Sequence, residues 1–573
     1  MRKNSVAVVV VGCSWLFPLV VRGEDTVNKT VEFTILHVND VYEIERPGDQ
    51  TLGGLSRVAE MRRKLVEQNP RTFTVLSGDA LSPSPLGSAV IDGEELAGRQ
   101  MVSVLNAIGL DFATFGNHEF DLKKDQLRKR ITESAFTWIS SNVTDSIGQS
   151  LPGVPKEVVL QIVDEAKNEV RVGLIGLTIN STWPEYVRFE DPIHAARNRV
   201  GKLRESCDVI IALTHLAVEQ DRRLAAAIPQ IHLILGGHEH QRSYECRATP
   251  ERYSAPIAKA DSNAKTVAVH RLSFDTETRR LSIRSRFVPV SGAPDPDPLT
   301  GKAPDDVDRR TDRLAKFWKE RGYRGLKEAF GYDPSQVVAQ SDVVLDGLDS
   351  SVRFRSTNLT DLIGEAMLAK VPKARAAIYN CGSIRIDDLL GPGTVRVYDV
   401  FRILPYEGKV VGVELDGRLL IDLLNKGKSI PDQGGFLQEV GIACGAKGEW
   451  EIDGERIQPA NSYSVAMADF LLQGKENLYG DARDPESING RLKRAWDKLR
   501  DEDKKLKHDR AQDDREIRLA VMEYMKKSNG HIQIAPKSNA AKLKLPANDI
   551  EQPVVEVDVD PPVNHTVHSP ESN

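Results

Sequence analysis

Five short apolar runs in the first half of the chain are each followed by side chains that can bind a divalent metal ion. Runs this short, rich in β-branched and aromatic residues, are typical of buried strands. The ends of such strands are where an α/β sheet gathers its ligand sites. Carboxylate, amide and imidazole groups together favour two first-row divalent ions over Ca²⁺, which prefers oxygen ligands alone. The candidate ligands are Asp40, Asp79, Asn117, His215, His238 and His240.

The elements that must position these side chains alternate between strands and helices from Val31 to about Ser291. This alternation predicts a layered α/β domain whose strand ends carry the chemistry. The predicted strands include residues 33–38, 73–76, 112–115, 170–175 and 209–213, and the predicted helices include residues 55–66 and 99–108.

With 573 residues, of which 40% are hydrophobic and 28% charged, the chain is too long for one ordinary core. The Pro/Asp-rich run 292–298 predicts a boundary, and a charged helix follows it. We expect a first domain over 31–295, a linker helix within 303–335, a second α/β domain over 336–528 and a disordered polar tail over 529–573.

The first 23 residues begin with positively charged side chains, continue with an apolar run and end in a small residue. This pattern predicts a cleaved secretory signal. An uncleaved anchor is the alternative, and no later segment is apolar enough to cross a membrane. Sequons at Asn28, Asn142, Asn180, Asn358 and Asn564 agree with a secreted or lumenal glycoprotein. The pairing of the cysteines stays open. A net charge of -6 argues against a nucleic-acid partner.

The motifs resemble those of the calcineurin-like metallophosphoesterases, and most of all the secreted 5'-nucleotidase group. That group includes 2',3'-cyclic phosphodiesterases and UDP-sugar hydrolases. The resemblance covers roughly residues 31 to 527 and implies a four-layer sandwich followed by a C-terminal α/β substrate-binding domain. It rests on Asn39-Asp40, Gly78-Asp79, the run Gly116–Asp121, Thr214-His215 and Gly237–His240, and in the second domain on Asn380–Arg385, Leu404–Tyr406, Gly435–Gln438 and Ala468–Phe470.

For the first domain, the resemblance implies that the Asp79 carboxylate bridges two metals, Zn²⁺ or Mn²⁺. Asp40 and His240 then bind one metal, while Asn117, His215 and His238 bind the other. His118 would lie over the phosphate, with Asp121 orienting it. A hydroxide shared by two metals can attack phosphorus in line with the leaving oxygen. The implied reaction is hydrolysis of nucleoside 5'-monophosphates to nucleoside and phosphate.

For the second domain, the resemblance implies recognition of the rest of the substrate. Arg353 and Arg385, with Arg355 in reserve, suit oxyanions because a guanidinium makes paired charge-assisted hydrogen bonds. Tyr406 and Phe470 match positions where the family sandwiches a base, although both could instead be core aromatics. Polar edges of the substrate would bind Asn380 and Asn358.

Three positions depart from the family pattern. Tyr42 stands where the family has a metal-binding histidine, which leaves either a weakened first site or an iron-binding phenolate. The loop Gly474–Asn477 replaces a glycine-rich base-site motif, with Glu476 keeping the acidic charge. Cys381 interrupts a glycine-rich stretch and is expected to be inert packing.

These departures leave alternatives open. The same metals could serve a cyclic-nucleotide phosphodiesterase or a sugar-nucleotide hydrolase. A non-catalytic nucleotide-binding relative is the alternative outside enzymes, with turnover lost through Tyr42. A hinge motion between the domains and a homodimer are also compatible with the sequence.

Overall fold

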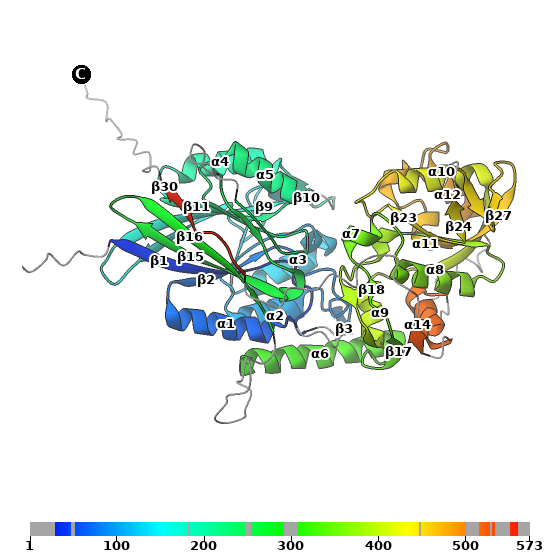
Figure 1. Cartoon of the computed structure of the whole chain (residues 1–573), viewed down its shortest axis with the longest axis horizontal. Helices are drawn as coiled ribbons and strands as arrows, with labels where there is room; N and C mark the ends of the chain where they lie inside the picture. Colours follow the sequence, from blue (N-terminus) through cyan, green and yellow to red (C-terminus); the bar gives the residue numbers. More distant parts are fainter. Residues whose placement is uncertain are drawn as a thin grey trace, which may run out of the picture.

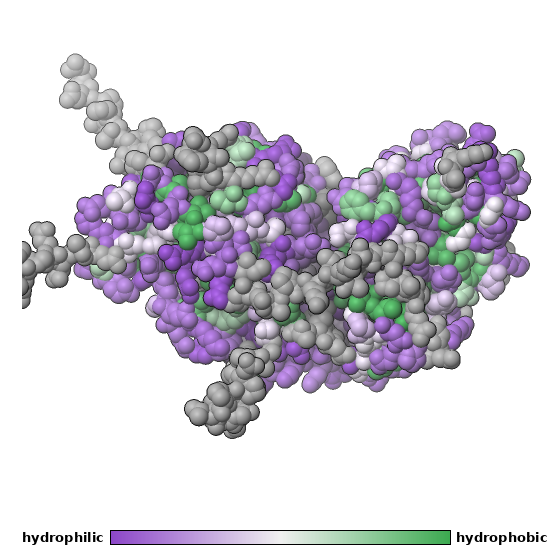
Figure 2. Space-filling view, viewed as in Figure 1, coloured by the Kyte–Doolittle hydropathy of each residue, from purple (hydrophilic) through white to green (hydrophobic). Residues whose placement is uncertain are grey.

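A computed structural model of the chain describes residues 29–46, 52–180, 184–246, 254–291, 307–445, 448–499, 515–527, 530–532 and 550–559. These residues form two lobes, and helix α6 (Arg309–Phe330) runs along one side from the first lobe to the second (Figure 1). In Figure 2 a notch separates the lobes, and most of the visible described surface is hydrophilic. Within the described ranges, every helix is too short or too polar to span a bilayer. The predicted signal, residues 1–23, lies outside these ranges.

The first lobe contains two stacked sheets. In the first sheet β1, β2, β5 and β6 run parallel, and β15 and β16 continue it antiparallel. In the second sheet β9, β11, β12 and β14 run parallel. The strands of the first sheet are β1 (Thr30–Val38), β2 (Thr72–Ser77), β5 (Phe112–Thr114), β6 (Thr137–Ile139), β15 (Thr266–Asp275) and β16 (Arg280–Pro289); those of the second are β8 (Glu157–Val163), β9 (Glu169–Thr178), β11 (Val209–His215), β12 (Leu233–Gly236), β13 (Ser243–Glu245) and β14 (Ile257–Lys259).

Helices cover the outer face of each sheet. Along β1, Phe33 and Ile35 enter the core between the sheets, whereas Leu36 and Val38 enter the core under the helices, as the two-residue repeat of a strand requires. Both faces are therefore buried, and the α-β-β-α order confirms the predicted four-layer sandwich. The covering helices are α1 (Leu55–Gln68) and α2 (Arg99–Ile108) on one side, and α4 (Pro192–Leu203) and α5 (Val218–Ala227) on the other; α3 (Lys124–Glu133) packs beside α2.

Two small ribbons complete the first lobe. They are β3 (Val90–Ile91) with β4 (Glu94–Glu95), and β7 (Val143–Asp145) with β10 (Val187–Phe189). Helix α6 lies close to the first ribbon, since a Cβ on Gly325 would come within 2.5 Å of the Val90 carbonyl oxygen. The glycine thus lets the connecting helix pack directly on the first lobe.

The second lobe is built on a four-stranded sheet with helices on both faces. Its order is β22 (Val410–Asp416), β27 (Ser462–Ala468), β19 (Ala376–Asn380) and β23 (Leu437–Val440). Helices α8 (Asn358–Lys370) and α14 (Ile517–Lys527) lie on one side, and α10 (Gly417–Lys428) and α12 (Ile488–Lys498) on the other. The shorter elements are β17 (Val337–Ser341), β18 (Leu345–Asp346), β20 (Leu389–Leu390), β21 (Gly393–Arg396), β24 (Ile442–Cys444), β25 (Trp450–Ile452), β26 (Glu455–Arg456), α7 (Asp349–Val352), α9 (Val397–Ile403) and α11 (Asp469–Leu472).

The C-terminal region departs from the expected disordered tail. Strand β28 (His531–Ile532) pairs with β17 in the second lobe. Strands β29 (Ile550–Glu551) and β30 (Val555–Asp558) pair with β16 and so extend the first sheet (Figure 1). Val555 and Val559 are buried in the core between the sheets, and the burial of these side chains stabilises the short strands. The prediction of disorder is wrong for these residues.

Two predicted glycosylation sites are inaccessible. The side chain of Asn142 is buried and donates to the carbonyl oxygens of Thr178 and Glu190. The side chain of Asn358 is also buried, at the start of α8, where it accepts from the Asp346 backbone N–H. Asn358 is therefore a structural residue, and among the described sequons only Asn180 is exposed. The four described cysteines are all free thiols.

Candidate metal centre and substrate cleft

The six candidate ligands come together at the carboxyl ends of parallel strands from both sheets. Asp40 follows β1, Asp79 follows β2, and His215 ends β11. Asp40, Asp79, His238 and His240 have φ angles of 52°, 57°, 91° and 56°. Non-glycine residues rarely adopt positive φ, and such backbone strain concentrates at functional sites.

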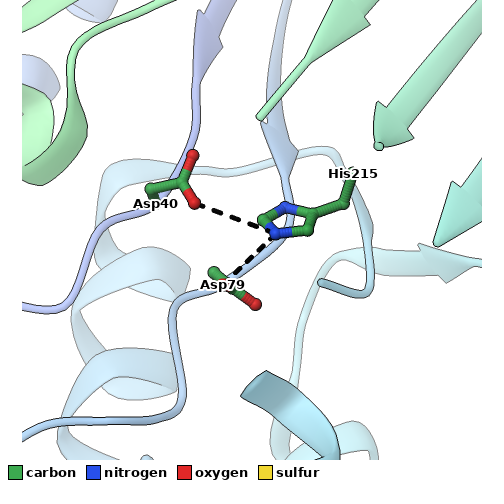
Figure 3. A group of neighbouring side chains, drawn as sticks. All are labelled: Asp40, Asp79 and His215. Atoms are coloured by element: carbon green, nitrogen blue, oxygen red, sulfur yellow. Dashed lines mark ion pairs between the residues drawn. The ribbon is translucent and has the colours of Figure 1, made fainter. Parts of the chain in front are cut away.

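Asp40, Asp79 and His215 form the centre of the cluster. One ligand atom from each lies within 4.8 Å of the others, and all three side chains are buried. The Nδ1 of His215 donates to the Ser77 carbonyl oxygen at 2.8 Å, which directs Nε2 to the carboxylates. That Nε2 lies 3.2 Å from Asp79 Oδ2 and 3.9 Å from Asp40 Oδ1 (Figure 3).

The other three candidate ligands surround this centre. The ring of His238 meets the ring of His215 edge-on, with 5.3 Å between centroids. The Nε2 of His240 lies 3.3 Å from Asp40 Oδ1. The side chain of Asn117 is buried, and its Oδ1 has no hydrogen-bond partner. Asp40 Oδ1 and His215 Nε2 also make no hydrogen bond, although buried polar atoms normally make one.

Three glycines leave room for this cluster. A Cβ on Gly78 would lie 2.6 Å from His215 Nδ1, and one on Gly116 would lie 1.9 Å from Asp79 Oδ1. A Cβ on Gly237 would lie 2.9 Å from Asp40 Oδ2. Each of these glycines precedes a candidate ligand, so the Gly-Asp, Gly-Asn and Gly-His pairs in the sequence reflect close contacts between loops.

The electrostatics of the cluster suit cations. Burial lowers the pKa of His215, but the carboxylates of Asp79 and Asp40 outweigh that effect and raise it to about 9. Burial, followed by repulsion from His215, lowers the pKa of His238 to about 3. The cluster combines two buried carboxylates, imidazoles and an amide oxygen, and three of its ligand atoms make no hydrogen bond. This donor set fits a pair of divalent transition ions.

Tyr42 lies inside the cluster rather than beside it. Its hydroxyl donates to Asp79 Oδ2 at 3.0 Å and lies 2.9 Å from His240 Nε2. Burial, together with the carboxylates of Asp79 and Asp40, raises the pKa of Tyr42 well above its ordinary value. The phenol is thus a protonated hydrogen-bond donor at the position of the expected histidine.

Glu119 organises the cluster, a role that the sequence did not indicate. Its buried carboxylate accepts from the backbone N–H groups of Asp79 (2.9 Å), Ala80 (2.7 Å), Leu81 (3.0 Å) and Gly116 (2.6 Å). It therefore ties the loop after β2 to the loop after β5. Its place within the Gly-Asn-His-Glu motif was the only available signal.

His118 and Asp121 form a pair at the mouth of the cluster. The Nδ1 of His118 contacts Asp121 Oδ2 at 2.7 Å, and the His118 backbone N–H donates to Asp79 Oδ1 at 2.9 Å. The hydroxyl of Tyr406, from the second lobe, lies 3.4 Å from the same Asp121 oxygen. The pair thus sits where the two lobes meet.

The structure brings only some of the predicted substrate residues to this junction. The guanidinium of Arg385 lies over the Tyr406 ring, 5.6 Å from its centroid. Tyr406 and Phe470 are 43% and 41% exposed, which rules out core packing for both. The described residues show no ring contact between them. Arg353 pairs with Asp349.

Asn380 and Glu476 lie beside the turn at Gly434 and Gly435 in the second lobe. Asn380 is buried and its Nδ2 lies 3.4 Å from the Gly434 carbonyl oxygen. The Glu476 side chain accepts from the Leu478 backbone N–H at 3.4 Å, at the start of a short 3-10 turn. Cys381 is buried, and burial raises its thiol pKa to about 12, as expected for an inert cysteine.

Two family models match the chain. Residues 33–242 match the calcineurin-like phosphoesterase model, and residues 337–481 match the model of the 5'-nucleotidase C-terminal domain. The chain therefore carries a calcineurin-like phosphoesterase domain followed by a 5'-nucleotidase C-terminal domain. This pair of domains indicates a phosphoric ester hydrolase. Calcineurin-like phosphoesterases use divalent metal ions, and the cluster at Asp79 is the candidate metal site.

The relatives with known names are identical to this chain at about a quarter of the aligned positions. The chain is 25% identical to the 5'-nucleotidase of Vibrio cholerae over 501 residues, 78% of this chain and 86% of that protein. It is 26% identical to human 5'-nucleotidase over 429 residues, 68% of this chain and 70% of that protein. A trifunctional nucleotide phosphoesterase of Bacillus subtilis, YfkN, is 25% identical over 456 residues, which span 29% of that longer protein.

Solved structures support the same fold. A 5'-nucleotidase precursor from Thermus thermophilus superposes with a TM-score of 0.64 at 21% identity, covering 88% of this chain and 98% of that one. A 5'-nucleotidase from Candida albicans gives 0.56 at 14% identity, covering 86% and 98%. At these identities the likeness establishes the two-domain fold alone.

Proposed function

We propose that the chain hydrolyses nucleoside 5'-monophosphates to nucleoside and phosphate with two divalent metal ions. The observation that carries this proposal is the buried cluster of Asp40, Asp79 and His215, in which one ligand atom of each residue lies within 4.8 Å of the others. Two ions bound there would activate water and neutralise phosphate oxygens.

In this proposal the two sheets each contribute to both metal sites. Asp79 would serve both ions. Asp40 and His240 would hold the first ion, and Tyr42 would contribute a hydrogen bond to Asp79 instead of a fourth strong ligand. Asn117, His215 and His238 would hold the second ion. Glu119 holds the loop after β2 against the loop after β5 by accepting from the backbone N–H groups of Asp79 and Gly116.

His118 acts on the phosphate ester directly. Because Asp121 accepts from Nδ1, the opposite ring nitrogen of His118 is available to the substrate. From there it stabilises charge on the phosphate or gives a proton to the leaving oxygen. Tyr406 contacts Asp121 from the second lobe, so substrate binding there is adjacent to this pair.

The second lobe supplies nucleotide recognition. Arg385 and Arg353 bind oxyanions, and the exposed rings of Tyr406 and Phe470 offer stacking faces for a base. Arg353, Asn380 and Glu476 have weaker support as ligand groups, because each already makes a contact within its own lobe. Export through the secretory pathway is part of the proposal and rests on residues 1–23 alone.

One experiment tests the proposal. The purified protein is analysed for metal content and assayed with AMP, cyclic AMP, UDP-glucose and an aryl phosphate, alongside Asp79→Ala. The proposal predicts two bound ions, a preference for AMP and loss of turnover in Asp79→Ala. A preference for cyclic AMP would indicate a cyclic-nucleotide phosphodiesterase, and a preference for UDP-glucose would indicate a sugar-nucleotide hydrolase. Nucleotide binding without hydrolysis under any metal would show instead that Tyr42 marks a non-catalytic relative.

A further inference from the structure

The interface between the lobes is polar, buried and centred on the segment 385–406 of the second lobe. Tyr398 and Arg402 both contact Glu43 of the first lobe, at 2.8 Å and 3.3 Å. Lys265 of the first lobe pairs with Asp388 at 2.7 Å, and both side chains are buried. These contacts hold the lobes together without touching the metal cluster.

One contact in this interface does reach the cluster. The Asp387 carboxylate, from the second lobe, accepts a short hydrogen bond from Nδ1 of His240. The other ring nitrogen of His240 faces Asp40 Oδ1 at 3.3 Å. His240 thus bridges the second lobe and the metal cluster.

Asp387 is itself held in place. Its other oxygen accepts from the Asp349 backbone N–H at 2.6 Å, and the side chain is only 8% exposed. Its backbone has a φ of 34°, a strained value for a residue with a side chain. A surrounding structure that enforces such strain at a contact with a candidate ligand is typical of a functional position.

We propose that Asp387 is a positioning residue that fixes the orientation and tautomer of His240, so that the second lobe completes the first metal site. This inference rests on the proposed function, in which His240 binds that metal. A carboxylate that accepts from Nδ1–H directs Nε2 of His240 toward Asp40 Oδ1, 3.3 Å away, so that both atoms would be available to a cation bound there. Partners of this kind contribute about 10- to 100-fold to metal affinity.

The position of Tyr42 makes this contribution more important here. The first site contains Asp40, Asp79 and His240, with the hydroxyl of Tyr42 in place of a second imidazole. His240 is then the only imidazole among the residues assigned to this ion. Its correct orientation depends on a residue of the other lobe.

The test is a Zn²⁺ titration of the metal-free full chain against a chromophoric chelator, with Asp387→Ala compared with Asp388→Ala. Both variants remove a buried carboxylate of the interface, but only Asp387 contacts His240. We expect Asp387→Ala to weaken one of two Zn²⁺ sites about 10- to 100-fold. Asp388→Ala should leave both affinities close to those of the unmodified protein, because the contact between Asp387 and His240 is kept.

The conservative variant extends the test. Asp387→Asn retains an acceptor oxygen, so its loss of affinity should be smaller than that of Asp387→Ala. If Asp387→Ala does not fold, Asp387→Asn against Asp388→Asn makes the same comparison. Equal Zn²⁺ affinities in the Asp387 variant and its Asp388 control would overturn the inference. A wild-type protein that binds no Zn²⁺ would instead overturn the proposed function.

Discussion

Gly116→Ala is the substitution whose effect the structure defines most sharply. The added Cβ would lie 1.9 Å from Asp79 Oδ1 and 2.6 Å from both its Cγ and its backbone N. The backbone of Gly116 does not have a positive φ, so an alanine there is strained only by this contact. The substitution therefore displaces the Asp79 carboxylate together with the backbone that carries it.

The size of the effect follows from the distance. Real Cβ contacts are rarely shorter than 3.0 Å, so Asp79 Oδ1 must move by at least 3.0 − 1.9 = 1.1 Å. A misplacement of about 1 Å at a reacting centre costs on the order of 100-fold in rate. The overpacking itself should lower the free energy of unfolding by about 1–3 kcal/mol.

The assay compares kcat/KM for an aryl phosphate, together with Tm, in Gly116→Ala and in Gly201→Ala. Gly201 is an exposed glycine of α4 with open space around its Cβ position, so its alanine variant should be active and slightly more stable. A Gly116→Ala enzyme within threefold of Gly201→Ala would refute the claim that Asp79 is held at the reacting centre.

Three further predictions follow from the same geometry. Tyr42→His should raise Zn²⁺ affinity at one site by replacing a phenol with an imidazole, as measured by chelator competition; unchanged affinity would mean that Tyr42 does not border a metal. Phe470→Ala should raise KM for AMP roughly 5- to 100-fold, because the base loses a stacking partner, while KM for the aryl phosphate should change little. An equal rise in KM for both substrates would show that Phe470 has a structural role instead. Deleting residues 550–573 should lower the stability of the first lobe by about 3 kcal/mol or more, since Val555 and Val559 are buried there; an unchanged Tm would show that the added strands contribute nothing.

The sequence predicted the layered fold and the ligand cluster because both depend on local patterns. Short apolar runs identify strands buried on both faces, and Asp40, Asp79 and His215 follow them directly in the chain. Parallel strands then place those side chains at one edge of each sheet, so their proximity follows from the topology.

The residues that the sequence did not reveal act through tertiary contacts. Glu119 binds backbone N–H groups from two loops, and no spacing rule identifies such an acceptor. Asp387 reaches His240 only because the lobes pack together. The strand at Val555–Asp558 had a local signal, the alternation of valine with acidic residues, but the surrounding polar and proline-containing composition outweighed it.

The most direct test of the account is anomalous X-ray diffraction at the zinc edge from crystals of the Zn²⁺-loaded protein. We expect two peaks about 3.5–4 Å apart, both in contact with the Asp79 carboxylate. One peak is expected beside Asp40 and His240, and the other beside Asn117, His215 and His238. Zinc peaks that lie away from Asp79, or no peak at all, would contradict the account.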